Sequence, residues 1–256
     1  MPNARKGRNT NRMSKTLCLD LGNTRWKAAL FVQENLQEIF VLGHDQESVN
    51  ALNEILQAHR PDYSILSSVV DHLMEMEEML RARTRFHKLS NQSVLPFTIP
   101  AGKPETVGAD RLALAAAAVH LFPAQNNLAI GLGTCITFNF INSSNEFMGG
   151  SISPGVELRF RAMHHFTAKL PLAKVHWNVP LIGYDTATNL QSGVVLGVAC
   201  ELDGIIDLYK KRFGNFNALL TGGDIRIFEP HLKNKIFADP ELIFKGLYAI
   251  SQVNHA

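Results

Sequence analysis

The first side chain placed to do chemistry is an aspartate at the end of an apolar run near the start of the chain. Asp20 ends the run LCLD, and the turn residues Gly22, Asn23 and Thr24 follow before a second apolar run begins. Glycine lets the backbone come close to a ligand, and successive N–H groups in a tight turn form a concave site for anions. An acid beside such a turn can hold Mg²⁺ through water, because this ion keeps several of its waters. The alternative is that Asp20 only caps a hairpin through a side-chain turn.

A second turn of the same kind lies about 111 positions further along the chain. The segment IGLGTCITFNFI repeats the order of LDLGNTRWKAALF, an apolar run, a glycine turn and another apolar run, with Gly133 in the place of Gly22. Two such units at half-chain spacing predict a duplicated domain whose two turns face each other. Together the turns could hold the phosphate chain of a nucleotide from both sides.

A third segment, ETVGADRLA, brings an acid and a cation together at the predicted start of a helix. Asp110 suits the positive end of the helix dipole there, whereas Arg111 does not. The pair could instead present a general base and a carboxylate-binding guanidinium to one substrate. Two glycine-rich segments, GGSISPG and TGGD, could admit a nucleotide base or sugar, or could be tight turns only.

The apolar pattern around these segments alternates between short apolar runs and helical periodicity, which predicts an α/β fold. Residues 95–108, rich in proline and glycine, are predicted to be mostly loop. Strands are predicted over 16–32 and 128–141, each with its turn, and over 63–70 and 218–224, the last of these running into a glycine loop. Helices are predicted over 47–59, 71–84, 109–122, 155–167, 240–252 and, as one or two pieces, 185–212.

The composition is that of a soluble globular protein, with 46% hydrophobic and 19% charged residues among 256, and a formal net charge of +2. This length suffices for one large domain or two of half that size. No run is long enough to predict a membrane span. The cysteines Cys18, Cys135 and Cys200 lie far apart, which argues against a metal site or disulfides and favours a reducing cytoplasm.

The start of the chain is basic. Residues 1–13 contain Arg5, Lys6, Arg8 and Arg12 and no acid, and we predict a disordered tail there. A nucleic-acid or membrane-binding arm is the alternative. No secretory signal is predicted, because no apolar segment follows the basic residues.

The motifs also resemble a known family. The ordered series DLGNTRWK, SSVV, GADR, GTCIT, GGSISPG, TAKLP, GYDT and LTGGD is similar to that of the type III pantothenate kinases, in the superfamily of actin, sugar kinases and the Hsp70 ATPase. The resemblance implies two ribonuclease H-like domains, expected over 14–124 and 125–256, with a nucleotide cleft between them. It implies phosphorylation of pantothenate by ATP and Mg²⁺, the first step of coenzyme A synthesis. It also implies a cytoplasmic homodimer with its active site at the interface, and no membrane or nucleic-acid partner.

The same resemblance implies roles for individual residues. Asp110 would be the general base, Arg111 would bind the carboxylate of pantothenate, and Gly108 and Ala109 would line the same pocket. Thr186 would reach the pantothenate bound by the partner subunit. The second turn would contact ATP through Gly133 and Thr134, and the first through Asp20, Leu21, Gly22, Asn23, Thr24, Arg25, Trp26 and Lys27, with Asp20 toward Mg²⁺.

The sequence departs from the family pattern at a few positions. Gly131 stands where the family has an aspartate that binds an activating K⁺ or NH₄⁺, so we expect monovalent cations to activate weakly or not at all. Ala101 stands where the family tends to have a tyrosine near pantothenate, and Asn139 stands where an acid is common. These changes leave two other interpretations. One is a non-catalytic relative that acts as a transcription accessory factor, and the other is a kinase of the superfamily with another small substrate.

Overall fold

The computed structural model describes residues 13–100, 102, 104–176 and 178–255. The predicted basic tail, except Met13, lies outside the described residues, as does Ala101. Within the described part of the chain, no helix is both long and apolar enough to cross a bilayer.

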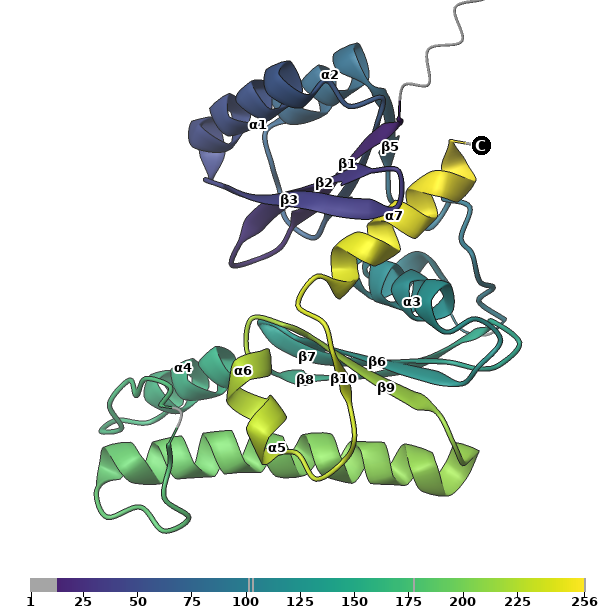
Figure 1. Cartoon of the computed structure of the whole chain (residues 1–256). Coiled ribbons are helices and arrows are strands. Elements are labelled where there is room, and N and C mark those ends of the chain that lie inside the picture. The colour runs from purple at the N-terminus through teal and green to yellow at the C-terminus, as the bar shows by residue number, and fades with distance from the viewer. Residues whose placement is uncertain (1–12, 101, 103, 177, 256) are drawn as a thin grey trace, which may run out of the picture.

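Two five-stranded sheets with the same topology form the frame of the protein (Figure 1). The first sheet contains β1 (Lys15–Leu21), β2 (Trp26–Val32), β3 (Asn35–Leu42), β4 (Tyr63–Ser68) and β5 (Arg85–Lys88). The second contains β6 (Asn127–Leu132), β7 (Cys135–Ile141), β8 (Phe147–Pro154), β9 (Asn217–Gly222) and β10 (Phe237–Ala238). Their orders, β3-β2-β1-β4-β5 and β8-β7-β6-β9-β10, match strand for strand, and so do the parallel and antiparallel pairings. The predicted duplication is confirmed.

Each predicted helix is present. The helices are α1 (Asp45–His59), α2 (Met74–Arg83), α3 (Ala109–Leu121), α4 (Val156–Phe166), α5 (Thr186–Phe213), α6 (Ile225–Phe228) and α7 (Leu242–Asn254). The predicted loop over 95–108 contains only a short 3₁₀ turn, Pro104–Thr106. The segment expected as one or two helices is the single helix α5. Its glycines do not interrupt it, and a Cβ atom on Gly193, Gly197 or Gly204 would meet open space.

The strands missing from the prediction lie toward the edges of the sheets. In β3 and β8 most side chains are exposed or half-buried, so neither strand shows the apolar run that marks a central strand. Gly150 of β8 also has a φ angle of 156°, and a Cβ atom there would lie 1.8 Å from the carbonyl oxygen of Phe138. Edge strands pair on one side only and need little burial, so hydrophobic pattern alone does not find them.

The sheets and helices form layers (Figure 1). α1 and α2 pack on the outer face of the first sheet, and α4, α5 and α6 pack on the outer face of the second. α3 and α7 lie between the two sheets, where Cys18 and Ile65 of the first sheet and Ala129 and Leu219 of the second share one buried cluster with them. The core is therefore continuous from one half of the chain to the other.

α7 extends the second half of the chain onto the first sheet, because it contacts α3, β1 and β4. Its Tyr248 ring stacks on Phe31 of β2, with 4.7 Å between ring centres. α7 also lies directly against the backbone of α3, since a Cβ atom on Gly246 would fall 1.8 Å from the carbonyl oxygen of Ala113. The two halves are thus interlocked through these helices, while the predicted domain boundary at 124/125 stays a prediction.

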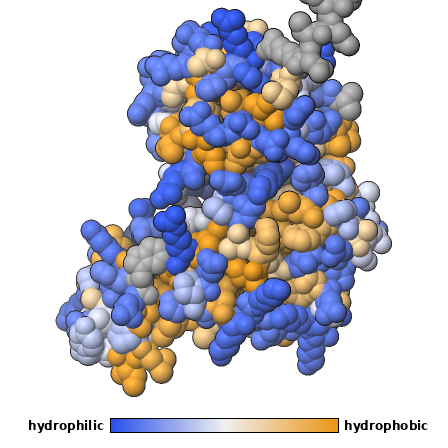
Figure 2. All heavy atoms as spheres, in the orientation of Figure 1, coloured by the Kyte–Doolittle hydropathy of each residue, from blue (hydrophilic) through white to orange (hydrophobic). Residues whose placement is uncertain are grey.

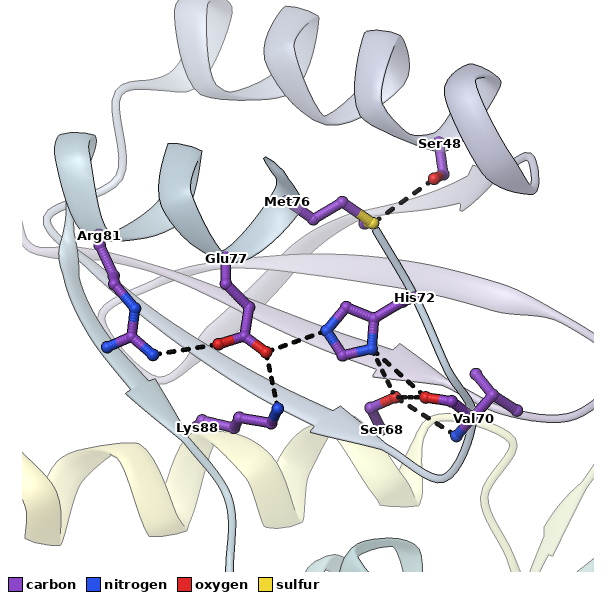
Figure 3. A network of polar contacts seen from close by, with 8 residues as sticks. All are labelled: Ser48, Ser68, Val70, His72, Met76, Glu77, Arg81 and Lys88. Atoms are coloured by element: carbon purple, nitrogen blue, oxygen red, sulfur yellow. Dashed lines mark hydrogen bonds and ion pairs between the residues drawn. The ribbon is translucent and has the colours of Figure 1, made fainter. Parts of the chain in front are cut away.

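A buried ionic network fixes the segment that leaves β4 (Figure 3). The Glu77 carboxylate has a side chain only 3% exposed, and it contacts Lys88 Nζ at 2.7 Å, Arg81 Nη2 at 3.0 Å and His72 Nε2 at 3.1 Å. The other ring nitrogen of His72 lies 3.1 Å from the Ser68 hydroxyl at the end of β4. Burial acts to raise the pKa of Glu77, but hydrogen bonds from Lys88, Arg81 and His72 outweigh it and lower this pKa below its usual value. The network joins the end of β4, α2 and β5.

We expect Glu77→Gln to lower the free energy of unfolding at pH 7 by about 1–3 kcal/mol, because a buried network loses its only anion. A carboxylate whose pKa is lowered by folding stabilises the folded protein at pH values above its unfolded pKa, near 4.5. This stabilisation is lost as the pH falls through the folded-state pKa. The difference from the unsubstituted protein should therefore shrink below pH 4.5 in urea unfolding. Glu78→Gln, at an exposed neighbour on α2, is the matched control. Equal stabilities of the Glu77→Gln and unsubstituted proteins at pH 7 would contradict this account.

Candidate functional site

The two glycine turns lie against each other where the sheets come closest. The first turn joins β1 to β2 and is closed by Gly22 N–H donating to the Arg25 carbonyl at 3.2 Å. The second joins β6 to β7 and is closed by Gly133 N–H donating to the Cys135 carbonyl at 3.1 Å. The hydroxyls of Thr24 and Thr134 are 3.2 Å apart across the gap between the halves. The sequence-based expectation that these turns face each other therefore agrees with the structure, and Figure 2 shows an indentation between the upper and lower halves of the molecule.

The second turn rests on a glycine at the start of α4. Gly155 N–H donates to the Thr134 carbonyl at 2.9 Å, and a Cβ atom on Gly155 would lie 2.2 Å from the Gly133 carbonyl oxygen. Only glycine therefore fits this position without moving the turn. The GGSISPG segment ends at Gly155, so the structure assigns this glycine a supporting contact with the turn.

Not every residue of the segment 20–27 faces the gap. Leu21 is fully buried and Trp26 is 6% exposed, and both belong to the core between the first sheet and α1. The Trp26 ring packs edge-on against His44 at 4.9 Å between centres. Asn23 and Arg25 are exposed beside Thr24. Polar contacts to a ligand are left to these exposed side chains and to the turn backbone.

Asp20 lies at the end of β1 and points toward the middle layer. It pairs in register with Lys27 of β2 and Ser67 of β4, and it shares a sheet face with Cys18, which contacts the middle-layer cluster. The pKa of Asp20 is raised to about 7, first by burial and next by the charge of Asp110, while the Ser67 hydroxyl and the Lys27 ammonium act to lower it. The structure thus brings together the two acids that the sequence singled out.

Asp110 occupies the first turn of α3, and the local geometry explains the glycine before it. The Asp110 carboxylate accepts a hydrogen bond from the backbone N–H of Arg111 at 2.9 Å, within the first turn of its own helix. A Cβ atom on Gly108 would lie 2.6 Å from this carboxylate oxygen, and only glycine leaves the space free. Ala109 is half-buried against the middle-layer cluster.

The Arg111 side chain runs from α3 to the second sheet rather than into open solvent. Its Nε donates to Asn139 Oδ1 at 2.7 Å, and its guanidinium carbon lies 5.7 Å from the centre of the Phe147 ring. Burial lowers the pKa of Arg111, and the negative charge of Asp110 opposes this. Sequence reasoning did not identify the contact with Asn139, because its partners come from distant elements.

Asp224 is a residue of this region whose contact sequence reasoning missed. It follows β9 in the TGGD segment, and burial raises its pKa, the charge of Arg25 lowers it and the charge of Glu157 raises it. Asp224 therefore lies within electrostatic reach of Arg25 in the first turn, although it belongs to the other half of the chain. The glycine pair in TGGD was the only signal in the sequence, and it did not specify a contact. Gly222 has a φ angle of 113°, and a Cβ atom there would lie 2.1 Å from the Leu132 carbonyl oxygen, which explains that glycine by backbone packing.

Thr186 does not join the site within one chain. It begins α5, which covers the outer face of the second sheet, whereas Asp110 begins α3 on the inner face. Thr186 is exposed next to Asp185, whose carboxylate caps α5 by accepting from Thr188 N–H at 2.7 Å. No group of three or more His, Cys, Asp or Glu side chains suited to a metal gathers among the residues that the structure describes.

Two matched sheets, joined by a helical layer and carrying glycine turns that meet between them, define the class of actin-like ATPase and sugar-kinase folds. Solved structures of low identity agree with this fold. A conserved Baf family protein from Campylobacter jejuni has a TM-score of 0.58 at 22% identity, over 93% of this chain and 98% of its own. Component A of (R)-2-hydroxyglutaryl-CoA dehydratase from Acidaminococcus fermentans has a TM-score of 0.51 at 11% identity, over 94% and 98%.

Sequence comparison then identifies the family. The model of the type III pantothenate kinases matches residues 16–208. A type III pantothenate kinase of Flavobacterium johnsoniae is 39% identical over 90% of this chain and 95% of its own. A type III pantothenate kinase of Cytophaga hutchinsonii is 39% identical over 93% of this chain and 99% of its own. The chain belongs to the type III pantothenate kinase family.

Replacing Asp20 should stabilise the metal-free protein above neutral pH. A carboxylate whose pKa is raised from 3.8 to about 7 on folding is ionised at a cost above pH 7, and this cost falls away as pH drops toward 4. We expect Asp20→Asn to raise the free energy of unfolding by about 1–3 kcal/mol at pH 8 without divalent ions, and by less at pH 5.

Urea unfolding between pH 4.5 and 8.5 measures this effect. Asp71→Asn, at an exposed aspartate, is the control and should change stability equally little at every pH. If Asp20→Asn does not raise the free energy of unfolding at pH 8, or raises it equally at pH 4.5 and pH 8.5, then Asp20 is not a strained buried acid.

Proposed function

We propose that this protein transfers the terminal phosphoryl group of ATP to the 4′-hydroxyl of pantothenate, the first step of coenzyme A synthesis. Family membership supports this reaction. The observation that carries it to particular residues is the placement of Asp110, at the start of α3, within electrostatic reach of Asp20 at the end of β1. A base, an anion-binding turn and a second acid are thereby gathered at one place.

In the proposed reaction, Asp110 accepts the proton of the attacking hydroxyl, and Arg111 beside it binds the carboxylate of pantothenate. Phosphoryl transfer depends chiefly on positioning and charge neutralisation, so a carboxylate held rigidly at a helix start is a suitable base. The contact between the Asp110 carboxylate and the Arg111 N–H fixes the direction of the acid. Gly108 and Ala109 then form the adjacent wall of the substrate pocket.

The residues present fit a Mg²⁺ ion that accompanies ATP. The two carboxylates are close enough for the charge of Asp110 to raise the pKa of Asp20, and the nearby Lys27 ammonium offsets this only in part. Mg²⁺ is typically bound by one or two carboxylates together with waters and phosphates, and Asp20 would hold it. When bound, the ion neutralises charge that develops on the phosphates.

The phosphate chain of ATP is proposed to bind between the two turns, from 20–27 on one side and at Gly133 and Thr134 on the other. The Thr24 and Thr134 hydroxyls are in contact, so a phosphate between them requires the turns to move apart. Arg25 of the first turn also lies close enough to Asp224 for its charge to lower the pKa of that acid, and this attraction would weaken as the turns move apart. ATP binding would thereby break the contact between Thr24 and Thr134 and replace it with contacts from each turn to the phosphates.

We propose that the enzyme does not depend on a monovalent cation. Gly131 occupies on β6 the place that Asp20 occupies on β1, and it has no side chain to bind an ion. A Cβ atom on Gly131 would lie 2.9 Å from Thr137 Oγ1 and 3.0 Å from Leu114 Cδ1, so neighbouring side chains fill the space that a larger residue would need.

We propose a homodimer that completes the substrate site. Thr186 and Asp110 lie on opposite sides of the second sheet, so Thr186 can contact pantothenate only in a second copy of the chain. Large apolar side chains stand exposed in the segment just before Thr186. Leu181, Ile182 and Tyr184 are each exposed by 82%. Exposed apolar side chains gathered in one segment are typical of a protein interface.

A cytoplasmic location agrees with the chemistry of the chain. The cysteines Cys18, Cys135 and Cys200 are all free, as expected for a protein in a reducing compartment. Its proposed substrates, ATP and pantothenate, are small and water-soluble.

The first test is ADP release with ATP, Mg²⁺ and pantothenate. We expect turnover to require pantothenate and to fall by about 10²–10³-fold in Asp110→Asn, because the general base is lost. Glu105→Gln, at an exposed acid just before α3, should keep its rate. Absence of pantothenate-dependent turnover from a folded unsubstituted protein would favour a non-catalytic relative or another small substrate.

The same assay, run with K⁺, with NH₄⁺ and with neither ion, tests the cation proposal. Equal rates in all three conditions are expected, because Gly131 supplies no carboxylate. A strict requirement for K⁺ or NH₄⁺ would show that other groups hold the ion.

The dimer is tested by sedimentation. We expect the double variant Leu181→Asp/Ile182→Asp to sediment as a monomer and to lose pantothenate-dependent turnover, because each chain then lacks the Thr186 of a second copy. Val41→Asp, at an apolar side chain of β3 that is 73% exposed, is the control and should remain dimeric and active. An unsubstituted protein that is monomeric and active would overturn the proposal.

A further inference from the structure

Ser67 carries a buried hydroxyl beside the site that the proposed reaction leaves without a role. It is the last but one residue of β4, and it is fully buried. Among the residues that the structure describes, its Oγ has no hydrogen-bond partner. A buried polar group without a partner is rare in a folded protein, because its lost contact with water is not replaced. The position of this hydroxyl therefore calls for a physical reason.

The register of the first sheet directs the Ser67 side chain toward Asp20. β1 and β4 are parallel neighbours, in which Asp20 pairs with Ser67 and Cys18 pairs with Ile65. Paired residues of neighbouring strands project from the same face of a sheet, and Cys18 and Ile65 both belong to the middle-layer cluster. Ser67 and Asp20 thus project side by side toward that layer, and the hydroxyl is close enough to lower the pKa of Asp20.

The other two serines of β4 project from the opposite face and have partners. The Ser64 hydroxyl lies 2.5 Å from Thr84 Oγ1, and the Ser68 hydroxyl donates to the Val70 carbonyl at 2.8 Å. Side chains alternate between the faces of a strand, so Ser67 is turned away from these contacts. It differs from both serines in facing an acid while its hydrogen-bonding capacity is unused.

The backbone that carries Ser67 is held on both sides. Val69 N–H donates to the Leu21 carbonyl at the end of β1, at 3.2 Å. The Ser68 hydroxyl lies 3.1 Å from a ring nitrogen of His72, which belongs to the buried ionic network of Figure 3. Ser67 is therefore carried by a fixed strand end, as a residue must be if it is to orient another side chain.

A hydroxyl in this place suits an ionised Asp20. A serine has one proton to donate, and an ionised carboxylate can only accept. A carboxylate that binds a metal is usually oriented by hydrogen bonds from groups behind it, and these groups affect metal affinity although they do not touch the ion. Ser67 is a neutral donor in such a position.

We propose that Ser67 is a positioning residue for Asp20, and that its hydroxyl donates to the Asp20 carboxylate and directs it toward Mg²⁺ when the ion and ATP bind. This inference rests on the proposed function, in which Asp20 holds Mg²⁺. It adds that affinity for the ion depends on a buried hydroxyl from a different strand.

The test is calorimetric binding of a non-hydrolysable ATP analogue, with Mg²⁺ and with EDTA in its place. In the unsubstituted protein, Mg²⁺ should tighten binding of the analogue. We expect Ser67→Ala to weaken binding in Mg²⁺ by about tenfold and to leave binding in EDTA unchanged, because the hydroxyl acts on the ion through Asp20. The Mg²⁺ concentration for half-maximal ADP release should rise in parallel.

Ser251→Ala is the matched control. Ser251 of α7 is also fully buried, and among the described residues its Oγ likewise has no partner. Its carbonyl accepts from His255 N–H at 3.1 Å, and the His255 ring packs against Tyr63, at the other end of β4 from Ser67. Loss of a buried hydroxyl as such is common to both variants. Ser251→Ala should keep the full effect of Mg²⁺.

A double variant shows whether Ser67 acts through Asp20. Asp20→Asn should remove the effect of Mg²⁺ on binding of the analogue, and adding Ser67→Ala to it should cause no further loss. If Ser67→Ala weakens binding as much in the Asp20→Asn background as in the unsubstituted protein, the proposed positioning is wrong.

Ser67→Cys keeps the proposal testable if Ser67→Ala does not fold. A thiol fills nearly the same space but is a weak donor, so this variant should also lose affinity in Mg²⁺. A full effect of Mg²⁺ in either folded variant would overturn the role of Ser67 alone. An unsubstituted protein whose affinity for the analogue does not respond to Mg²⁺ would instead overturn the metal-binding role proposed for Asp20, and this inference with it.

Discussion

The close packing of two helices between the sheets is the constraint on which the rest of the structure depends. α7 can lie on α3 only because Gly246 has no side chain opposite the Ala113 carbonyl. The alanines of α3 keep this layer thin, and both inner sheet faces are buried against it. A larger residue at either helix surface would push the sheets apart, and the two glycine turns would no longer meet. The contact between Thr24 and Thr134 is thus a consequence of packing along the middle layer.

The site is built where this layer ends, and it is electrostatically unfavourable without a ligand. Asp20 is held in a place where burial and a neighbouring acid both disfavour its charge. Stability elsewhere must offset that cost, and the continuous core provides it. Such strain is common at functional sites, since a group poised to bind a cation is unfavourable until the cation arrives.

Much of the fold could be predicted from the sequence, because the central strands are apolar runs and the two glycine turns recur at half-chain spacing. The edge strands β3 and β8 could not, since their side chains are largely exposed and follow no apolar pattern. The candidate acids at 20 and 110 were identified by residue type and local context. Their closeness was not, because it depends on how α3 packs against the first sheet. The Arg111–Asn139 contact was missed for the same reason, since it joins elements 28 residues apart whose neighbours are set by packing.

The two halves share a topology but differ in the charge of the residue that precedes each glycine turn, so the two sides of the site are not equivalent. On β1 the position before the turn is Asp20, whereas on β6 it is Gly131, and the space beside that glycine holds Thr137 and, through it, Asn139. The first half therefore supplies the two acids, and the second supplies neutral hydrogen bonds that hold a guanidinium. In the proposed reaction, Asp20 would meet a metal-bound phosphate chain, and the guanidinium of Arg111 would meet the anionic group of the acceptor.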